Sequence, residues 1–246
     1  MKEVSIEFPD VFILCGGQGT RFQEVRKDIP KALAPINGVP FLDLLLNDLV
    51  KQGCKRIVLG TGYLSEKIEA HVKQRRNAEY LISREEAPLG TAGAIRHALP
   101  LFKSEEVLVL NGDSTIKFSI KDLIVYQKEQ KSEATVVLSS NTKGAEYGNV
   151  ELDEKMRVEM FNEKPKNKLN KYINAGIYYL QKELICEIPL GEISSIEKTW
   201  LPKWSLSKLL YGFPVAESVL DIGTKERYFY AQEKIGQENS EKKFMK

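Results

Sequence analysis

The stretch that decides the fold spans residues 11–31, VFILCGGQGTRFQEVRKDIPK. It opens with a short apolar run at residues 11–14, which indicates a buried strand, and continues into the glycine-rich segment 15–21. Glycines let backbone N–H groups approach an anion closely, and Arg21 and Lys31 add the positive charge that a polyphosphate needs. The pattern therefore predicts a strand that leads into a phosphate-binding loop.

Two better-known glycine-rich loops do not fit this segment. A dinucleotide-binding G-x-G-x-x-G motif starting at Gly17 would need a third glycine where the chain has Phe22. A P-loop would need Gly-Lys-Ser/Thr at its end, and none follows at the required spacing. A simple tight turn stays open as an alternative, but the pair of Arg21 and Lys31 favours anion binding.

The composition limits the classes of function. The 246 residues suffice for one α/β domain with a full core, and we expect residues 1–246 to form a single domain. Basic and acidic side chains number 36 and 34, so the formal net charge of +2 gives no general attraction to nucleic acid or membrane. The three cysteines form no C-x-x-C pair, and no apolar stretch approaches bilayer length. We therefore expect a cytoplasmic protein that binds neither nucleic acid nor membrane.

Strands and helices alternate after the loop, which predicts an α/β fold with a largely parallel sheet. In order, we expect a helix over 41–52 that ends at Gly53, a strand over 57–60, a helix over 66–75 with Ser65 as N-cap, a strand over 79–82, a helix ending near Leu99, a strand over 107–110, a helix over 119–130 and a strand over 134–138.

The pattern changes in the second half of the chain. Residues 147–152 and 156–161, joined by a charged turn, indicate antiparallel strands inserted into the fold. Strands over 172–180 and 215–220 and a closing helix over 225–234 follow, and residues 236–246 are expected to be a frayed, charged tail.

Two aspartates follow predicted strands directly. Asp113 comes after the fully apolar run 107–110, and Asp221 comes after the run 215–220. In open parallel sheets, ligands bind at the carboxyl ends of the strands, and Mg²⁺ prefers carboxylate oxygens and substrate phosphates. An Asn-Gly-Asp sequence alone is more often a turn than a metal site, so both interpretations of Asp113 stay open at this point.

Taken together, these motifs resemble the sugar-1-phosphate nucleotidylyltransferases. The similarity rests first on Leu14-x-Gly16-Gly17-x-Gly19-Thr20-Arg21 with Pro30-Lys31, and it covers about residues 10–235. It implies a Rossmann-like three-layer αβα sandwich with a mixed, mainly parallel sheet and a small antiparallel β insertion. It also implies a nucleotide-binding part over about 10–130 and a sugar-binding part over about 131–235.

The resemblance implies a role for each matching residue. Arg21 and Lys31 are expected to be catalytic, on the pyrophosphate side. Residues expected to bind the nucleotide, with the 85–93 segment against the base, are Leu14, Gly16, Gly17, Gly19, Thr20, Glu85, Leu89, Gly90 and Gly93. Residues expected to bind the sugar phosphate are Gly148, Glu163, Lys164 and Asn174, and those expected to hold Mg²⁺ as the cofactor are Asp113 and Asp221.

Several positions have plainer interpretations or depart from the family pattern. Ala32 and Ala87 replace a proline and an acidic residue that are usual in the family. Thr91 could be only a helix cap, and the glycine of the 174–176 segment could mark only a strand bulge. The only histidines, His71 and His97, and the tryptophans Trp200 and Trp204 are expected in packing or exposed roles.

The activity that the resemblance implies is transfer of a nucleoside monophosphate from an NTP to a sugar 1-phosphate, with release of pyrophosphate, for surface glycan synthesis. The segment 27–42 is most similar to guanylyltransferases acting on D-glycero-α-D-manno-heptose 1-phosphate, and next to mannose-1-phosphate guanylyltransferases. Uridylyl or thymidylyl transfer to glucose 1-phosphate stays open. So do a cytidylyltransferase for a non-sugar phosphate, a non-catalytic nucleotide-sugar-binding regulatory subunit, and a homo-oligomeric state.

Overall fold

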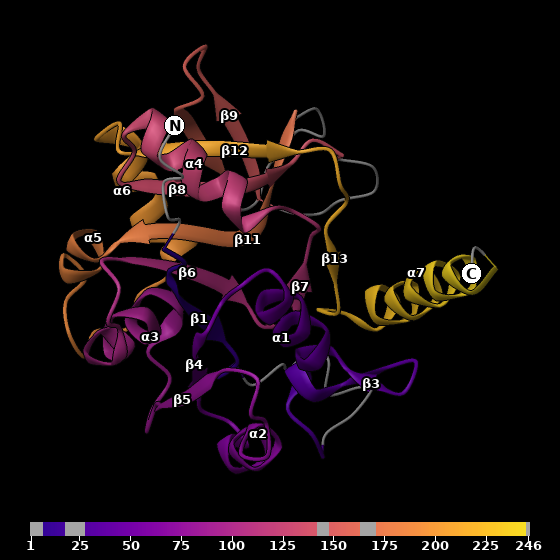
Figure 1. Cartoon of the computed structure of the whole chain (residues 1–246). Coiled ribbons are helices and arrows are strands. Elements are labelled where there is room, and N and C mark those ends of the chain that lie inside the picture. Colours follow the sequence, from indigo (N-terminus) through magenta and orange to yellow (C-terminus); the bar gives the residue numbers. More distant parts are fainter. Residues whose placement is uncertain (1–6, 18–27, 142–147, 163–170, 245–246) are drawn as a thin grey trace.

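The computed structural model describes residues 7–17, 28–141, 148–162 and 171–244 (Figure 1). Within these residues, one sheet contains nine strands, and its main path runs β10-β9-β11-β6-β1-β4-β5. The strands β1 (Asp10–Leu14), β4 (Arg56–Thr61), β5 (Glu79–Arg84) and β6 (Glu106–Asn111) are parallel to one another. The predicted parallel part of the sheet is therefore confirmed.

The other part of the sheet is mixed. The long strand β11 (Tyr172–Gln181) runs antiparallel to β6, to β8 (Ala134–Ser139) and to β9 (Asn149–Leu152). The strand β10 (Val158–Asn162) pairs antiparallel with β9, and β12 (Leu210–Val215) pairs parallel with β8. The β9–β10 hairpin is the predicted antiparallel insertion.

Helices cover both faces of the sheet, because side chains along each strand alternate between two cores. On one face Val11 and Ile13 pack with α1 (Phe41–Lys51), α2 (Ser65–Val72), α4 (Ile120–Gln130) and the first turns of α7 (Lys225–Phe244). On the other face Phe12 packs with α3 (Gly90–Ala98), α5 (Lys182–Cys186) and α6 (Leu201–Leu206). The expected three-layer αβα sandwich is therefore confirmed. No helix in the described residues is long and apolar enough to cross a membrane.

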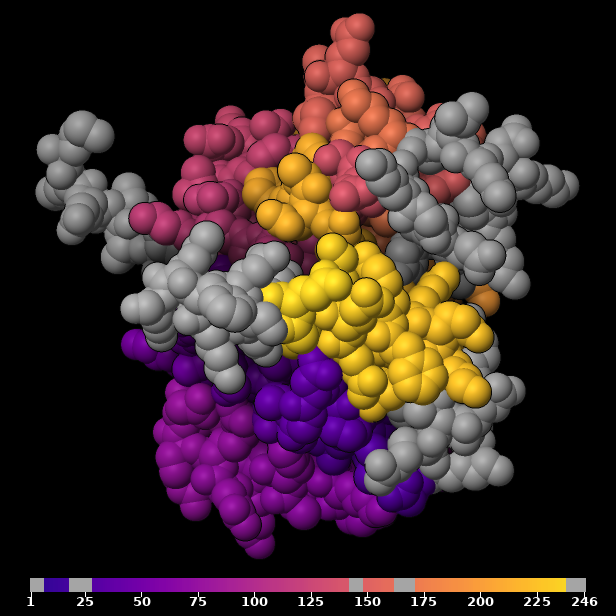
Figure 2. Space-filling view, turned by 90° about the vertical axis from the view of Figure 1, so that its right-hand side faces the viewer, coloured from indigo at the N-terminus to yellow at the C-terminus, as the bar shows by residue number. Residues whose placement is uncertain are grey.

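Two short strand pairs complete the fold. The pair of β2 (Pro35–Ile36) and β3 (Val39–Pro40) lies against α7, where the Tyr228 hydroxyl donates to the Pro35 carbonyl oxygen at 2.6 Å. Figure 2 looks onto this side and shows α7 in contact with the N-terminal residues that carry β2 and β3. The second pair joins β7 (Ser114–Thr115) to β13 (Leu220–Asp221). It brings the two predicted metal ligands, Asp113 and Asp221, onto neighbouring segments.

Several predicted boundaries differ from the structure, and three of them have a clear physical reason. The strand predicted over 215–220 is wrong: β12 ends at Val215, the chain bends, and only Leu220–Asp221 is extended again. Ser65 is not an N-cap but the first helical residue, because Leu64 before it has a left-handed backbone with φ of 54°. The helix α7 continues to Phe244, beyond its expected end near residue 234, because a single glycine costs a helix only about 1 kcal/mol.

Candidate functional site

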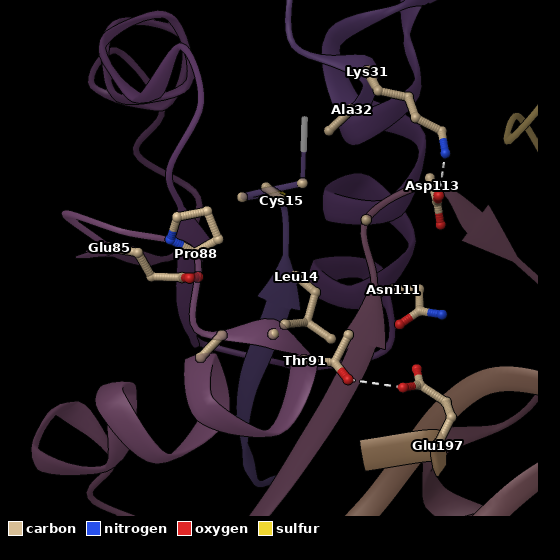
Figure 3. Close-up of a pocket in the computed structure, with 15 residues that line it drawn as sticks. Leu14, Cys15, Lys31, Ala32, Glu85, Pro88, Thr91, Asn111, Asp113 and Glu197 are labelled. Atoms are coloured by element: carbon tan, nitrogen blue, oxygen red, sulfur yellow. Dashed lines mark hydrogen bonds and ion pairs between the residues drawn. The ribbon is translucent and has the colours of Figure 1, made fainter. Parts of the chain in front are cut away.

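A cavity of about 310 Å³ opens at the carboxyl ends of β1 and β6, which pair with Leu14 beside Asn111 (Figure 3). Seven of the residues that the sequence proposed line it: Leu14, Gly16, Gly17, Lys31, Glu85, Gly90 and Asp113. Eight further residues line it that were not predicted to belong to the site: Cys15, Ala32, Pro88, Thr91, Ala94, Asn111, Gly112 and Glu197. Parallel strands deliver their carboxyl ends to one edge of a sheet, which explains why distant motifs meet here.

The described start of the glycine-rich segment forms one wall of the cavity. The Cys15 amide donates to the Gly60 carbonyl oxygen at 2.8 Å, which extends the β1–β4 ladder by one step. A methyl group on Gly16 would lie 3.1 Å from Glu85 Oε1 and 3.2 Å from the Gly62 amide nitrogen. Gly16 therefore lets the backbone pass close to both. Burial raises the pKa of the Cys15 thiol to about 12, with a smaller contribution from the Asp113 carboxylate, so this thiol is neutral and a poor nucleophile.

A lysine and two aspartates meet at the opposite end of the cavity. Lys31, on the 3₁₀ turn Lys31–Leu33, forms an ion pair with the Asp113 carboxylate, and Figure 3 shows the two side chains pointing toward each other. The Ile222 amide donates to the Asp113 carbonyl oxygen at 2.9 Å, so Asp221 lies beside Asp113 in space. A methyl group on Gly223 would lie 2.9 Å from Asp221 Oδ1 and 3.7 Å from Lys31 Nζ. The structure thus brings the predicted catalytic lysine and both predicted metal ligands into one cluster.

Asp221 is the more buried of the two aspartates, with a side chain 6% exposed against 38% for Asp113. Its Oδ1 accepts from the Gly223 amide at 2.7 Å, and its Oδ2 accepts from Arg227 of α7 at 3.2 Å. Burying a carboxylate is favourable only where donors surround it, and these contacts keep the charge in place. Asp221 does not itself line the cavity.

The carboxylate oxygens in this cluster fit a magnesium ion that is also bound by a substrate. No group of three or more histidine, cysteine or acidic side chains capable of holding a metal occurs in the part of the chain that the structure describes. Mg²⁺ needs six oxygen ligands and is usually bound by one or two carboxylates together with phosphates and water. Asp113 and Asp221 match that requirement, because they supply hard carboxylate oxygens and leave the other positions to phosphate.

The 85–93 segment forms the wall opposite this cluster. Glu85 Oε2 accepts from the Leu89 amide at 2.9 Å, and burial raises the pKa of the Glu85 carboxyl above its ordinary value. Pro88 lies beside Glu85 in the cavity wall (Figure 3). Leu89 and Gly93, which we expected to bind the nucleotide, do not line the cavity.

The glycines of this segment have a packing role that the sequence did not reveal. Gly90 has φ of +72°, and a methyl group on it would lie 2.4 Å from the Ser194 carbonyl oxygen. A methyl group on Gly93 would lie 2.6 Å from the Glu192 carbonyl oxygen. The 192–194 segment therefore crosses the start of α3 in direct backbone contact. The Ser194 carbonyl oxygen also accepts from the Ala92 backbone amide at 3.0 Å, so it satisfies an N–H group in the first turn of α3.

Two predicted sugar-binding residues lie together on the mixed part of the sheet. The backbone amide of Asn174 donates to the Gly148 carbonyl oxygen at 2.9 Å. The register of β11 shifts between Asn174 and Tyr178, and Gly176 has φ of +72°, so the bulge interpretation is confirmed. A methyl group on Gly176 would lie 2.5 Å from Asn111 Nδ2, which places the bulge directly beside the cavity. Neither Asn174 nor Gly148 lines the cavity itself.

Five predicted site residues lie outside the residues that the structure describes, and their roles stay predictions: Gly19, Thr20, Arg21, Glu163 and Lys164.

Sequence reasoning missed Glu197 entirely and took Thr91 as a possible cap. Thr91 Oγ1 donates to Glu197 Oε2 at 2.7 Å across the cavity (Figure 3). No local pattern distinguishes Glu197 from other acidic residues, because it is separated from Thr91 by more than a hundred positions. The threonine carried a weak signal, since a small hydroxyl residue between two glycines is also common in a binding loop.

The packing or exposed roles predicted for the histidines and tryptophans are confirmed, with His97 exposed and both tryptophans buried. His71 Nε2 contacts Asp43 Oδ1 at 2.8 Å, and His97 Nε2 contacts the Arg84 carbonyl oxygen at 3.1 Å. The rings of Trp200 and Trp204 pack at 5.9 Å between centroids in the core of the α3 face.

The nucleotidyl transferase family matches residues 11–238, and the chain belongs to this family. A D-glycero-α-D-manno-heptose 1-phosphate guanylyltransferase of Campylobacter jejuni is 36% identical over 219 residues, which are 89% of this chain and 96% of that protein. The enzyme of the same name from Aneurinibacillus thermoaerophilus is 34% identical over 228 residues, 92% of this chain and 98% of that protein. A mannose-1-phosphate guanylyltransferase of Mycobacterium tuberculosis is 30% identical, but the match covers only 62% of it.

Solved structures agree with this assignment. The crystal structure of HddC from Yersinia pseudotuberculosis has a TM-score of 0.82 and 31% identity, over 92% of this chain and 99% of that one. The structure of HddC complexed with GMP-PN has a TM-score of 0.81 and 32% identity. The resemblance and the fold class that the sequence indicated are therefore confirmed.

Proposed function

We propose that this chain transfers GMP from GTP to D-glycero-α-D-manno-heptose 1-phosphate and releases pyrophosphate, in the cytoplasm and for surface glycan synthesis. The observation that carries the proposal is the near-complete match to two guanylyltransferases of that name, together with the cluster of Lys31, Asp113 and Asp221 at the cavity. The HddC complex with GMP-PN supports a guanine nucleotide as the donor.

The reaction would proceed by direct in-line displacement. A phosphate oxygen of the sugar 1-phosphate forms a bond to the α-phosphorus of GTP while the bond from that phosphorus to the bridging β-phosphate oxygen breaks. The attacking oxygen is already anionic, so no general base has to remove a proton. This agrees with a cavity whose thiol, Cys15, is held neutral by burial and whose wall in the described residues contains no histidine.

Catalysis then consists of holding two anions together and balancing their charge. Lys31 lies at the end of the cavity, and we propose that it binds the phosphates of the donor together with Arg21. Lys164 and Glu163 are proposed to bind the acceptor phosphate and sugar hydroxyls. The ion pair between Lys31 and Asp113 keeps both side chains at the cavity before any substrate arrives.

Mg²⁺ would be held by Asp113 and Asp221 and would neutralise negative charge on the phosphates. Members of this family generally use a divalent metal ion. Arg227, which donates to Asp221, would balance its negative charge and hold its side chain in place. Gly223 has to be small here, because a side chain would enter the space between Asp221 and Lys31.

Glu85 is the group that we propose to select guanine. The Watson–Crick edge of guanine presents two neighbouring donors, N1–H and N2–H, and a carboxylate is an acceptor for both. Glu85 Oε2 is fixed by the Leu89 amide, while its Oε1 faces the cavity beside Gly16. Pro88, next to it, offers an apolar surface on which a base can stack.

The experiment that tests this function is pyrophosphate release with Mg²⁺ across a matrix of NTPs and sugar 1-phosphates. We expect release with GTP and the heptose phosphate. Release with GTP and mannose 1-phosphate alone would keep the reaction and replace the acceptor, and release with UTP or dTTP and glucose 1-phosphate would replace both substrates. Binding of nucleotide sugar without release in any combination would favour a regulatory subunit.

A further inference from the structure

Glu197 joins the two sides of the cavity through its carboxylate. It lies on the π-helical turn Ile196–Trp200, and it lines the cavity. Its Oε2 accepts from Thr91 Oγ1 at 2.7 Å and from Ser195 Oγ at 2.8 Å, and its Oε1 accepts from the Tyr178 hydroxyl at 3.3 Å. Thr91 belongs to α3, on the nucleotide side, and Tyr178 belongs to β11, on the sugar side. One carboxylate therefore connects the two halves.

The direction of these hydrogen bonds is fixed by the backbone. Thr91 Oγ1 itself accepts from the Ile196 amide at 2.8 Å, and Ser195 Oγ accepts from the Lys198 amide at 3.2 Å. Each hydroxyl thus has an acceptor role already filled and turns its single hydrogen toward Glu197. Glu197 is held as a pure acceptor, with both oxygens placed by the protein.

The chain of hydrogen bonds continues to the predicted sugar ligand Asn174. Because the Tyr178 hydroxyl donates its hydrogen to Glu197, its oxygen accepts from Asn174 Nδ2 at 2.9 Å. Asn174 Oδ1 accepts from the Gly176 amide at 2.9 Å, so the orientation of the whole side-chain amide is determined. Within the residues that the structure describes, Nδ2 makes no second hydrogen bond, so its other hydrogen can donate to an oxygen outside this chain of bonds, such as a sugar hydroxyl.

We propose that Glu197 is a positioning residue for the acceptor sugar. It acts through Tyr178, which fixes the Asn174 amide as a donor to a sugar hydroxyl, and through Thr91, which ties that arrangement to the nucleotide side. The inference rests on the proposed function and deepens it, since it names the residues that orient the acceptor sugar. These residues are also hydrogen-bonded to Thr91, on the nucleotide side. Its consequence is that changes at Glu197 alter acceptor binding and leave donor binding unchanged.

Two substitutions test this chain of hydrogen bonds at different residues. In Glu197→Gln the amide oxygen can still accept from Thr91 and Ser195, but the amide nitrogen faces Tyr178 as a donor, so the direction of the bond at Tyr178 reverses. In Tyr178→Phe the link between Glu197 and Asn174 is removed. We expect each variant to raise the KM for the sugar 1-phosphate about 5- to 10-fold and to keep the KM for GTP within about twofold.

The neighbouring tyrosine on the same strand supplies a matched control. Tyr179 is 1% exposed, its hydroxyl donates to Glu106, and it packs in the core of the opposite sheet face. Tyr179→Phe removes the same hydroxyl from an equally buried position away from the cavity, so both KM values should stay at the wild-type level. Thr91→Val should raise the acceptor KM, and Thr91→Ser, which keeps the hydroxyl, should restore it.

The measurements are steady-state KM values for both substrates, with thermal unfolding to confirm that each variant is folded. A rise in the acceptor KM alone for Glu197→Gln and Tyr178→Phe, absent in Tyr179→Phe, supports the inference. Equal rises in both KM values, or no change in the acceptor KM, overturn it while the proposed function stands. A wild-type protein that releases no pyrophosphate with any pair of substrates overturns the proposed function itself, and the inference with it.

Discussion

The two walls of the cavity are built in different ways. The first wall, at the ends of β1 and β6, places Gly16 and Asp113 just after parallel strands, and Lys31 on a 3₁₀ turn beside them, so all three lie in short motifs. The second wall, formed by the start of α3 and the turn Ile196–Trp200, is held by hydrogen bonds between distant segments, because Thr91 and the buried Tyr178 of β11 both donate to Glu197. Both walls lie beside the same cavity.

This difference shows where local sequence is informative. A strand end fixes the position of the next residues through the backbone, so a motif there carries the chemistry with it. A side chain held by partners a hundred residues away has no local pattern that marks it. We therefore expect substitutions on the first wall to affect the chemical step, and substitutions on the second wall to affect binding of one substrate.

The largest effect should follow from removing a charge on the first wall. Asp113→Ala removes one of the two carboxylates proposed to hold Mg²⁺ and the partner of Lys31, and we expect kcat to fall on the order of 10²-fold or more. The measurement is pyrophosphate release under saturating Mg²⁺. Asp122→Ala, at an exposed position in the first turn of α4, is the control and should leave kcat unchanged. Near-normal turnover of Asp113→Ala would remove the metal assignment.

A second prediction concerns the backbone contact that holds the second wall together. Gly90→Ala puts a methyl group 2.4 Å from the Ser194 carbonyl oxygen on a backbone with φ of +72°, so we expect the free energy of unfolding to fall by about 2 kcal/mol or more. Gly38 also has a positive φ, +85°, but a methyl group there would meet nothing within 4 Å.

The control Gly38→Ala therefore isolates the backbone strain and should cost only about 1 kcal/mol. Denaturant unfolding of both variants measures the difference. If the two losses were equal, the close approach of Ser194 to α3 would not limit which residue fits at position 90, and the packing role given to Gly90 would be wrong.

The smallest effect should be a pH-dependent loss of guanine selection. Burial raises the pKa of Glu85, and only the ionised carboxylate accepts from guanine N1–H and N2–H. The accepting form is present above this raised pKa and is lost as the pH falls through it. On acidification, the Kd for GTP should therefore begin to rise at a higher pH than it would with a glutamate of ordinary pKa.

Glu85→Gln should raise the Kd for GTP about fivefold at neutral pH and remove this part of its pH dependence. Calorimetric titration with GTP and with ITP, which lacks the N2 amino group, provides the test. The wild type should prefer GTP, and the variant should lose that preference. An unchanged ratio of GTP to ITP affinity would place guanine recognition elsewhere.

Much of the fold followed from the sequence. Strand and helix alternation through residue 138, the β9–β10 hairpin and the three-layer arrangement were predicted correctly, because apolar periodicity reports which faces are buried. The error at 215–220 has a physical cause: Val215 completes β12 beside β8, and only pairing with β7 makes Leu220–Asp221 extended. Pairing partners distant in the chain are not encoded in local periodicity.

By itself, the sequence determined the family, the three-layer α/β fold and the cavity residues Lys31, Glu85 and Asp113, because these three lie in short motifs whose backbone geometry is local. Only the tertiary structure decided that Gly90 is required by the Ser194 carbonyl oxygen and that Glu197 links Thr91 to Tyr178. These contacts join segments that are far apart in the chain. Sheet order and helix packing bring the segments together, so the contacts depend on the whole folded core.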